Sequence, residues 1–134
     1  MTRRLLPILC AAGALIFPAA AAADHSVGSA SQIAWVRSAA GRFVAAELSS
    51  DGANACSILN VPLRGTNCQQ RWDGRIAALL RDPADRARLR RQAAEIPSAV
   101  VVVSGNYARI ELPTRLLRGP NRFLWTENCW MLTG

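Results

Sequence analysis

Lysine is absent from this 134-residue sequence, histidine occurs once, as His25, and no Cys-x-x-Cys motif is present. Each absence weighs against a class of function. A structural zinc site usually takes four cysteine or histidine ligands at close spacing, and a thioredoxin-like redox site needs the Cys-x-x-Cys pair. We therefore expect neither a bound metal nor another cofactor, and we expect the cysteines to be structural.

Long apolar runs are absent beyond residue 23, whereas the residues before it have the composition of an export signal. Arg3 and Arg4 precede an uncharged apolar stretch from Leu5 to Phe17, and five alanines follow before Asp24. A basic start, a short apolar run and small residues at the cut are what signal peptidases recognise. We predict a cleaved signal peptide over residues 1–23, which leaves 111 of the 134 residues as one exported domain without a stable membrane span.

Other interpretations of the N-terminus stay open. The stretch could remain as an uncleaved anchor, although prolines and alanines dilute it relative to the roughly 20 strongly apolar residues of a membrane span. The two arginines also weakly resemble a twin-arginine signal. Lipid attachment at Cys10 is disfavoured, because the bulky Leu9 directly precedes this cysteine.

After cleavage the chain would keep Cys56, Cys68 and Cys129. Thiols oxidise outside the cytosol, so we predict a Cys56–Cys68 disulfide across a short segment rich in turn formers. Pairing with Cys129 is the alternative, because connectivity does not follow from sequence. Otherwise Cys129 is a buried small apolar residue, which we favour, or it forms an intermolecular bridge.

All 16 basic side chains are arginines, and the formal net charge is +7. Five of them crowd into the segment "RDPADRARLRRQ": Arg81, Arg86, Arg88, Arg90 and Arg91. We interpret this cluster as a solvated helix face. It lacks the aromatic platform of a nucleic-acid site, so no nucleic-acid partner is expected, whereas contact with anionic envelope lipids or polymers is an alternative.

Apolar residues at helical spacing predict the first helix. The stripe consists of Ile33, Val36, Ala40, Phe43, Val44 and Leu48. We expect Ser31 to cap its start and Asp51-Gly52 to end it, with residues 24–31 as a flexible lead-in. The stripe is interpreted as core rather than as a ligand contact.

Caps and breaks predict three more helices. A short one should begin near Asp51 or Gly52, and residues 60–66 should form a loop or a brief extended piece because they contain proline and glycine. Asn67 then offers an N-cap for the third helix. The fourth should have Asp82 as its cap and should end at Pro97.

Beyond this point the pattern changes to strands. The β-branched run 99–103, the turn "SGN" and the alternating "YARIELP" predict a hairpin. After a Gly-Pro-Asn break, "RFLWTENCWMLTG" is interpreted as one strand, with Phe123, Trp125, Glu127, Cys129 and Met131 on one face. Helices followed by antiparallel strands predict an α+β fold, with the helices packed on one face of the sheet.

Several local patterns resemble one known superfamily. "RFVAAELSSDGANACSIL" looks like a long first helix, a break and an Ala-Cys second helix; "AVVVVSGNYARIEL" is similar to a characteristic strand-turn-strand; and "ENCWMLTG" is similar to a terminal strand bearing tryptophan. Together with the order of elements, they resemble small exported proteins of the NTF2-like superfamily, also called SnoaL-like or cystatin-like. The resemblance spans residues 32–134.

The resemblance implies a curved sheet wrapped by helices and enclosing a cone-shaped pocket. Some members are cyclases or isomerases, and many others have no known catalysis. We expect the pocket wall to come from Tyr107, Phe123, Trp125 and Trp130, since pockets for small molecules are mostly apolar and aromatic.

Catalytic residues are less well marked than the pocket. The candidate acids and phenol are Glu47, Asp73, Glu111, Glu127 and Tyr107, and no spacing among them indicates an acid–base pair. Glu127 is the weak candidate, as a carboxyl among apolar neighbours. The structural alternative is an ion pair between Glu127 and Arg109 or Arg115 across the sheet.

Three hypotheses about function follow. The leading one is an exported, non-enzymatic domain that binds a small apolar ligand or a cell-envelope partner. The second is a small SnoaL-like cyclase, isomerase or dehydratase that uses Glu127 or Asp73 as its base. The third is an arginine-rich module for anionic envelope components.

Overall fold

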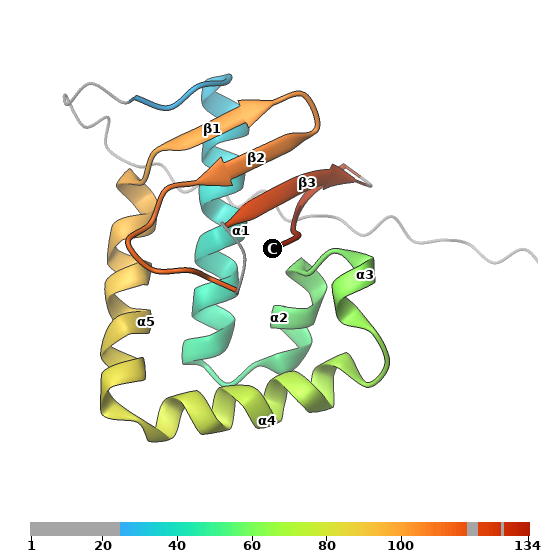
Figure 1. The fold of residues 1–134 in the computed structure, drawn as a ribbon, viewed down its shortest axis with the longest axis vertical. Coiled ribbons are helices and arrows are strands. Elements are labelled where there is room, and N and C mark those ends of the chain that lie inside the picture. Colours follow the sequence, from blue (N-terminus) through green and yellow to red (C-terminus); the bar gives the residue numbers. More distant parts are fainter. Residues whose placement is uncertain (1–24, 118–120, 127) are drawn as a thin grey trace, which may run out of the picture.

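The computed structural model describes residues 25–117, 121–126 and 128–134. The predicted signal peptide and Glu127 therefore lie outside the described residues. Within these ranges the chain forms five α-helices, one 3₁₀-helix and a four-stranded antiparallel sheet, which confirms the α+β class (Figure 1). None of the helices in these ranges combines the length and the apolar character that crossing a bilayer requires.

The first helix, α1 (Ala30–Leu48), carries the predicted apolar stripe, and its most deeply buried members are Val36, Ala40, Phe43 and Val44. Its cap is Ser29 instead of the expected Ser31. The Ser29 hydroxyl accepts a hydrogen bond from the Gln32 amide at 3.1 Å, and the Gln32 side chain accepts one from the Ser29 amide at 3.1 Å. This reciprocal pair satisfies two amide groups at once, which explains the earlier start.

Part of the expected lead-in pairs with the first strand, β1 (Val101–Ser104). The Val27 amide donates to the Val101 carbonyl at 2.8 Å, and the Val27 carbonyl accepts from the Val103 amide at 2.7 Å. Val27 thus extends the β1 edge of the sheet by one bridge.

The second helix, α2 (Gly52–Ile58), is confirmed, and Asp51 caps it by accepting a hydrogen bond from the Asn54 amide at 3.1 Å. The loop expected over residues 60–66 instead contains one helical turn, α3 (Val61–Arg64). Proline is compatible with this turn because a residue of the first turn has no helical N–H bond to lose.

A disulfide joins α2 to the next helix, α4 (Cys68–Arg81). Cys56 and Cys68 are bonded, with 6.1 Å between their Cα atoms, which confirms the predicted pairing. Closing so short a loop stabilises the fold by about 3 kcal/mol in the chain-entropy account. Cys129 is buried as expected, but it too is disulfide-bonded, so the interpretation of it as a free thiol is wrong.

The fifth helix, α5 (Pro83–Glu95), begins at the predicted cap, where the Asp82 carboxylate accepts a hydrogen bond from the Ala84 amide at 2.8 Å. It ends in a 3₁₀ turn, η1 (Ile96–Ser98), at the predicted stop. The arginine cluster is solvated at Arg81, Arg86, Arg90 and Arg91. Arg88 differs from these, because it is half-buried.

The remaining strands are β2 (Tyr107–Ile110), β3 (Arg122–Thr126) and β4 (Cys129–Leu132), and the sheet order is β1-β2-β3-β4. The segment interpreted as one strand is therefore a hairpin. Thr126 pairs with Cys129, and Asn128 adopts the left-handed conformation with φ of 61°.

The hairpin reverses the predicted faces after residue 126. Trp125 lies directly opposite Trp130, and Phe123 lies opposite Leu132. These four side chains share the face of the sheet that packs on the helices, whereas Cys129 lies on the other face. The single-strand interpretation placed Cys129 on the same face as Phe123, and it was wrong. The turn was not predicted because it lacks the usual glycine or proline signal.

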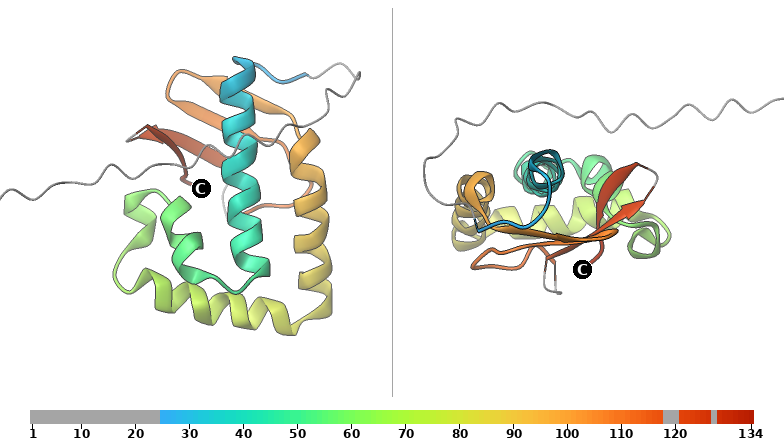
Figure 2. Two further views of the ribbon diagram at one scale, coloured as in Figure 1. Left: turned by 180° about the vertical axis from the view of Figure 1, so that it is seen from behind. Right: turned by 90° about the horizontal axis from the view of Figure 1, so that it is seen from above.

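The helices lie on one face of the sheet and leave the other face without a helix in the described part of the chain (Figure 2). Helices α1 and α5 run side by side, and α4 crosses their ends (Figure 1). The core fills the space between α1 and the sheet, with Phe43 and Phe123 completely buried. The corner where α4 meets α1 and α5 is the part of the fold that positions the site.

Candidate functional site

The aromatic residues predicted to line a pocket occupy three different environments. Phe123 and Trp130 belong to the buried core, Trp125 is half-buried, and Tyr107 is exposed on the outer face of β2. None of these four lines either of the two cavities described below. Their role in binding remains a prediction.

Trp125 nevertheless belongs to an aromatic cluster. Its ring stacks on that of Trp35 of α1, with ring centroids 5.8 Å apart. It also packs edge to face with the Trp130 ring, with centroids 5.3 Å apart. Trp35 is 43% exposed, so the cluster reaches the surface. Such ring pairs stabilise packing by about 1 kcal/mol beyond their burial, and we interpret this cluster as structural.

Two of the predicted acids have structural roles. The Asp73 carboxylate accepts a hydrogen bond from the Gly52 amide at 3.0 Å and thereby ties α4 to the start of α2. A side chain at Gly52 would collide with this carboxylate, which explains the glycine. Glu111 is exposed and forms an ion pair with Arg109 at 3.4 Å. Neither acid lines the cavities described below.

Glu47 is the acid that the fold places in a distinctive environment. It lies on the last turn of α1, where α4 crosses, and it is only 4% exposed. Burial raises the pKa of Glu47 from 4.5 to about 7, while the charges of Arg75 and Arg88 act in the opposite direction. Desolvation outweighs both charges, because charging a buried carboxyl is costly unless a cation contacts it.

The cavity in front of Glu47 is lined mainly by polar groups and has a volume of about 240 Å³. Arg75 of α4, Arg88 of α5 and Arg115 of the loop that follows β2 contribute guanidinium groups. The remaining lining residues are Leu79, Leu89, Gln92, Leu116 and Leu117. We call this space the cationic cavity, because three arginines face a single carboxyl group there.

Arg88 does not neutralise Glu47. Its Nη2 atom pairs with Asp85 at 3.3 Å, and among the described residues no ion pair within 4.0 Å joins Glu47 to Arg75 or Arg88. The Arg88 Nε atom is buried and has no hydrogen-bond partner. Buried donors without partners are rare in native proteins and call for an explanation, such as a bound ion or water.

The rim of this cavity is held in place by Gln92, which is almost fully buried. Its side-chain amide donates to the Thr114 hydroxyl at 2.7 Å and to the Arg115 carbonyl at 3.3 Å. These bonds attach the loop after β2 to α5. The loop is therefore held at Thr114 and at the backbone of Arg115 before any ligand arrives.

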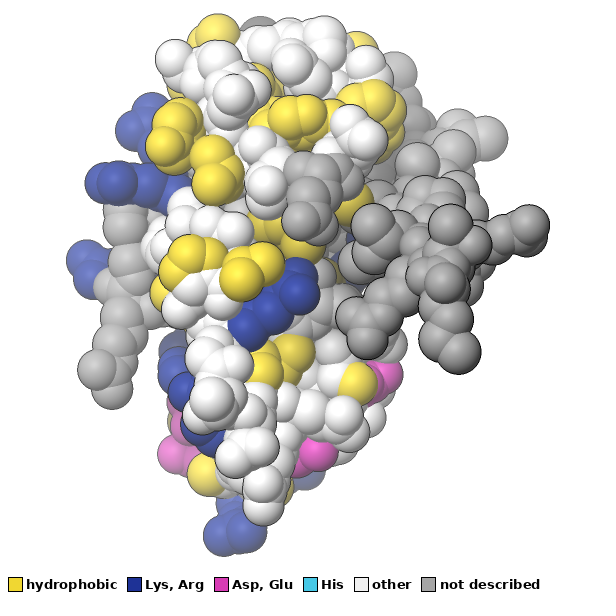
Figure 3. Space-filling view, turned by 90° about the vertical axis from the view of Figure 1, so that its right-hand side faces the viewer, with side chains coloured by type: hydrophobic (Ala, Val, Ile, Leu, Met, Phe, Trp, Pro, Cys, Tyr) yellow, Lys and Arg dark blue, Asp and Glu magenta, His cyan; other side chains and the backbone are white. Residues whose placement is uncertain are grey.

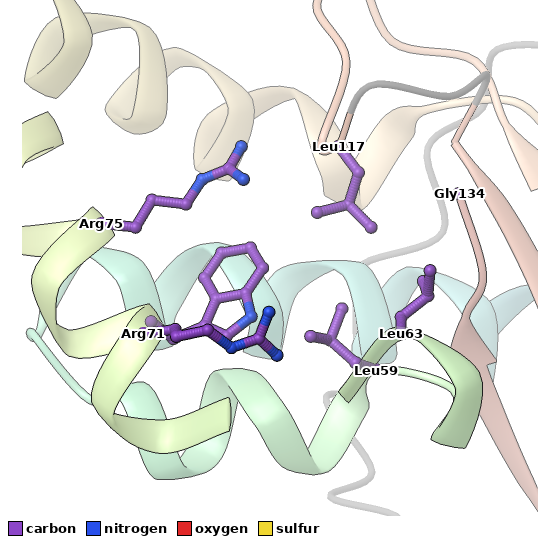
Figure 4. Close-up of a pocket in the computed structure, with 7 residues that line it drawn as sticks. Leu59, Leu63, Arg71, Arg75, Leu117 and Gly134 are labelled. Carbon is purple, nitrogen blue, oxygen red and sulfur yellow. The ribbon is translucent and has the colours of Figure 1, made fainter. Parts of the chain in front are cut away.

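A second cavity of about 310 Å³ adjoins the first. It is lined by Leu59, Leu63, Arg71, Trp72, Arg75, Leu117 and Gly134 (Figure 4). Three leucines and a tryptophan make its wall mostly apolar, and we call it the apolar cavity. Arg75 extends over the Trp72 ring, with the guanidinium carbon 4.9 Å from the ring centroid. This cation–π contact fixes Arg75 between the two cavities.

The apolar cavity opens near an apolar patch of the surface. Val61 and Leu63 of α3 are 59% and 39% exposed. Seen from the side on which α3 lies, apolar side chains lie to the left of, above and below a group of arginine side chains near the middle of this face (Figure 3). The face that carries α3 therefore combines the same two chemistries as the interior of the apolar cavity.

One feature of the sequence indicates this site. Glu47 is four residues after Phe43 and three after Val44, so it lies within the apolar stripe of the first helix. A carboxyl on the buried face of a helix is rare unless it is paired or functional. The convergence of Arg75 and Arg88 on it depends on the crossing of three helices, which no local pattern reveals.

The described part of the chain contains no group of three His, Cys, Asp or Glu residues placed to hold a metal ion. No known protein family, curated protein or solved structure matches this chain.

Proposed function

We propose that the chain is an exported, non-enzymatic domain that binds a small molecule with an apolar body and an anionic head. The observation that carries the proposal is the shared wall, because Arg75 and Leu117 line both cavities. A molecule that crosses this wall meets leucine and tryptophan on one side and guanidinium groups on the other.

The charge of the cationic cavity supports an anionic head. Three guanidinium groups and one carboxyl line it, and the pKa of that carboxyl, raised by burial to about 7, leaves it partly uncharged at neutral pH. Arginine binds carboxylate, sulfate and phosphate groups through paired N–H donors, and such charge-assisted bonds are roughly twice as strong as neutral ones.

The volumes support a small ligand. Cavities for small molecules usually measure about 300–1,000 Å³, and the apolar cavity, at about 310 Å³, is near the lower limit. A short alkyl chain or a single ring fits this space, whereas a two-chain lipid exceeds it. The ligand class is thus a small amphiphile rather than a membrane lipid bound whole.

Membership of the NTF2-like superfamily belongs to the same proposal. The order of helices and antiparallel strands supports it. The proposed site differs from the expected cone, since it lies between α1, α4, α5 and the loop after β2. A cone lined by Trp125 and Trp130 is the rival location, and the experiments below include variants that separate the two.

The direct test measures binding of hexane-1-sulfonate, which has an apolar body and a head that stays charged at all working pH values. Isothermal titration at pH 6 should detect binding of one molecule per chain. Hexan-1-ol, which lacks the charge, should bind at least tenfold more weakly, because a charge-assisted hydrogen bond contributes about 1.5–3 kcal/mol.

Two variants and two matched controls locate the site. Arg75→Gln and Arg88→Gln should each weaken hexane-1-sulfonate binding about tenfold or more. Arg81→Gln on α4 and Arg90→Gln on α5 remove an exposed arginine from the same helices and should change the affinity less than twofold. Equal weakening by all four variants would support the arginine-rich interaction module instead.

Catalysis is the second candidate function, and Glu47 favours it more than Asp73 does. A cavity-lining carboxyl with a pKa near 7 has the property of a general base. Binding is preferred because Glu47 is the one carboxyl side chain among the residues that line the cationic cavity, the other polar side chains being guanidinium groups and an amide. Chemical conversion of a bound carbonyl compound that is lost in Glu47→Gln would overturn the preference.

Export is the remaining part of the proposal, and the Cys56–Cys68 disulfide supports it because such bonds persist outside the reducing cytosol. The intact mass of the protein purified from the cell envelope or the culture medium should correspond to a chain that begins at Asp24. A mass that still includes residues 1–23 would contradict this part of the proposal.

A further inference from the structure

We propose that binding of an oxyanion in the cationic cavity is coupled to uptake of one proton by Glu47, so that the site binds anions tightly in mildly acidic conditions and releases them in alkaline ones. This inference rests on the proposed function, and it adds the regulation of the same site. Three features of the cavity carry it, and each is a matter of geometry.

The first feature is the position of Glu47 relative to the cations. The carboxyl lines the same cavity as Arg75, Arg88 and Arg115, which come from α4, α5 and the loop after β2. Among the residues that the structure describes, Asp85 also contacts one of these cations, pairing with Arg88 at Nη2. An anion that enters the cavity therefore approaches the arginines and Glu47 together.

The second feature is the unused donor. Arg88 Nε is buried and has no hydrogen-bond partner, while the Nη2 atom of the same guanidinium is held by Asp85. An oxyanion oxygen would supply the missing acceptor. The charge of Arg88 lowers the pKa of Glu47, yet no ion pair joins Glu47 to Arg88 among the described residues.

The third feature is burial. Glu47 is 4% exposed, so water screens its charge poorly, and a negative charge on it would repel an incoming anion strongly. A protonated Glu47 removes this repulsion and can donate its own O–H to an oxyanion oxygen. The proton comes from solvent and returns to it when the anion leaves, so the cycle balances without another reactant.

The consequence follows from thermodynamic linkage, because a ligand that binds the protonated form better must raise the affinity of that form for the proton. The pKa of Glu47 in the unliganded protein is about 7. Affinity for an anion of fixed charge should therefore be constant below about pH 6. Above about pH 7.5 the affinity should fall by up to about tenfold for each pH unit, over the pH range in which Glu47 of the bound protein stays protonated.

The test measures the affinity for hexane-1-sulfonate between pH 5.5 and about 8.5, together with the number of protons taken up. Titrations in buffers of different ionisation enthalpy should give a small uptake at pH 6 that approaches one proton near pH 8.5. Glu47→Gln should abolish the uptake and hold the affinity near its acidic value throughout. His25→Gln controls for the single histidine and should leave the pH profile unchanged.

A second measurement does not depend on the variant. The carboxyl carbon of Glu47, followed by NMR with isotope-labelled glutamate, should titrate at higher pH when saturating hexane-1-sulfonate is present. An unchanged titration, or proton uptake that persists in Glu47→Gln, would overturn the coupling.

The outcomes separate this inference from the proposed function. Equal affinity at pH 6 and pH 8.5, with weakening by Arg75→Gln and Arg88→Gln, overturns the proton coupling and leaves the binding function intact. Coupled binding of inorganic sulfate as tight as that of hexane-1-sulfonate keeps the coupling but contradicts the amphiphile. Absence of binding at pH 6 by either anion, at millimolar concentration, overturns both.

Discussion

The guanidinium carbon of Arg75 lies 4.9 Å from the centre of the Trp72 ring, and both side chains line the apolar cavity. Trp72 in turn meets the edge of the buried Phe43 ring at 5.4 Å. The arginine that divides the two cavities is thus braced, through one tryptophan, against the hydrophobic core. Removing the tryptophan should affect both stability and binding.

We expect Trp72→Leu to lower the free energy of unfolding by about 2–4 kcal/mol, because it replaces a buried ring with a smaller side chain and removes the aromatic contact. Hexane-1-sulfonate should bind this variant several-fold more weakly. Urea denaturation and isothermal titration measure the two effects.

The matched control for that variant is Trp35→Leu, which removes the exposed tryptophan that stacks on Trp125. It should cost less than about 1.5 kcal/mol and leave the affinity for hexane-1-sulfonate unchanged. Loss of binding in Trp35→Leu, with normal binding in Trp72→Leu, would place the ligand at the cluster of Trp35, Trp125 and Trp130, two of which belong to the pocket wall predicted from the sequence.

The stability of the unliganded protein should fall as the pH rises from about 4.5 to about 7. Glu47 has a higher pKa in the folded protein than its ordinary 4.5, so the folded state holds the proton more tightly than the unfolded state does. This contribution is complete below about pH 4.5 and is lost as the pH rises through about 7. At about 1.4 kcal/mol per pKa unit, the loss amounts to at most about 3.5 kcal/mol.

Glu47→Gln should abolish this contribution, so at pH 8 the variant should be more stable than the unmodified protein. Glu111→Gln, which changes an exposed carboxyl paired with Arg109, is the control and should leave the pH profile nearly unchanged. Denaturation midpoints measured between pH 5 and pH 8.5 test both variants. Identical profiles for Glu47→Gln and the unmodified protein would mean that Glu47 is solvated in solution.

The Cys56–Cys68 disulfide should contribute about 3 kcal/mol. The double variant Cys56→Ala/Cys68→Ala should lower the urea midpoint accordingly, while the arrangement of α2 and α4 persists through the hydrogen bond between Asp73 and Gly52. An unchanged midpoint would show that this bond is absent from the purified protein.

The turn between β3 and β4 should tolerate glycine and reject a β-branched residue. Asn128 has φ of 61°, a conformation that costs most L residues about 1–2 kcal/mol. We expect Asn128→Gly to preserve stability and Asn128→Val to lower it by about this amount, as measured by urea denaturation. Equal stability of the two variants would argue for the continuous strand that the sequence pattern indicated.

Most of the helical layer could be predicted from local signals. The stripe ending at Leu48, the cap at Asp82 and the stop at Pro97 are each decided within one or two helical turns. The same is true of the disulfide, since the short spacing of Cys56 and Cys68 made their pairing the simplest one. The α+β class followed from the change of period after Pro97.

The hairpin could not be predicted because its turn carries no strong local signal. Alternation continued across residues 127 and 128, so the pattern was consistent with a single strand. The pairing of Trp125 with Trp130, as seen in the structure, is decided by packing on the helices. A two-residue turn returns the chain without breaking the alternation of apolar residues, although it changes which ones share a face.

The candidate site was beyond the sequence for a different reason. Glu47, Arg75 and Arg88 lie on three helices, and their approach depends on the crossing of α4 over the ends of α1 and α5. The arginine-rich segment was interpreted as a uniformly solvated face. Only Arg88 of that segment lines the cationic cavity, because it lies beside the buried Leu89 and one turn before Gln92.

The most direct test of the account is an experimental structure of the protein with hexane-1-sulfonate bound at pH 6. The account predicts the sulfonate within hydrogen-bond distance, about 3 Å, of the guanidinium groups of Arg75 and Arg88, with the alkyl chain against Trp72. A ligand seated instead between Trp35 and Trp125, or a structure whose two cavities stay empty at saturating ligand, would contradict it.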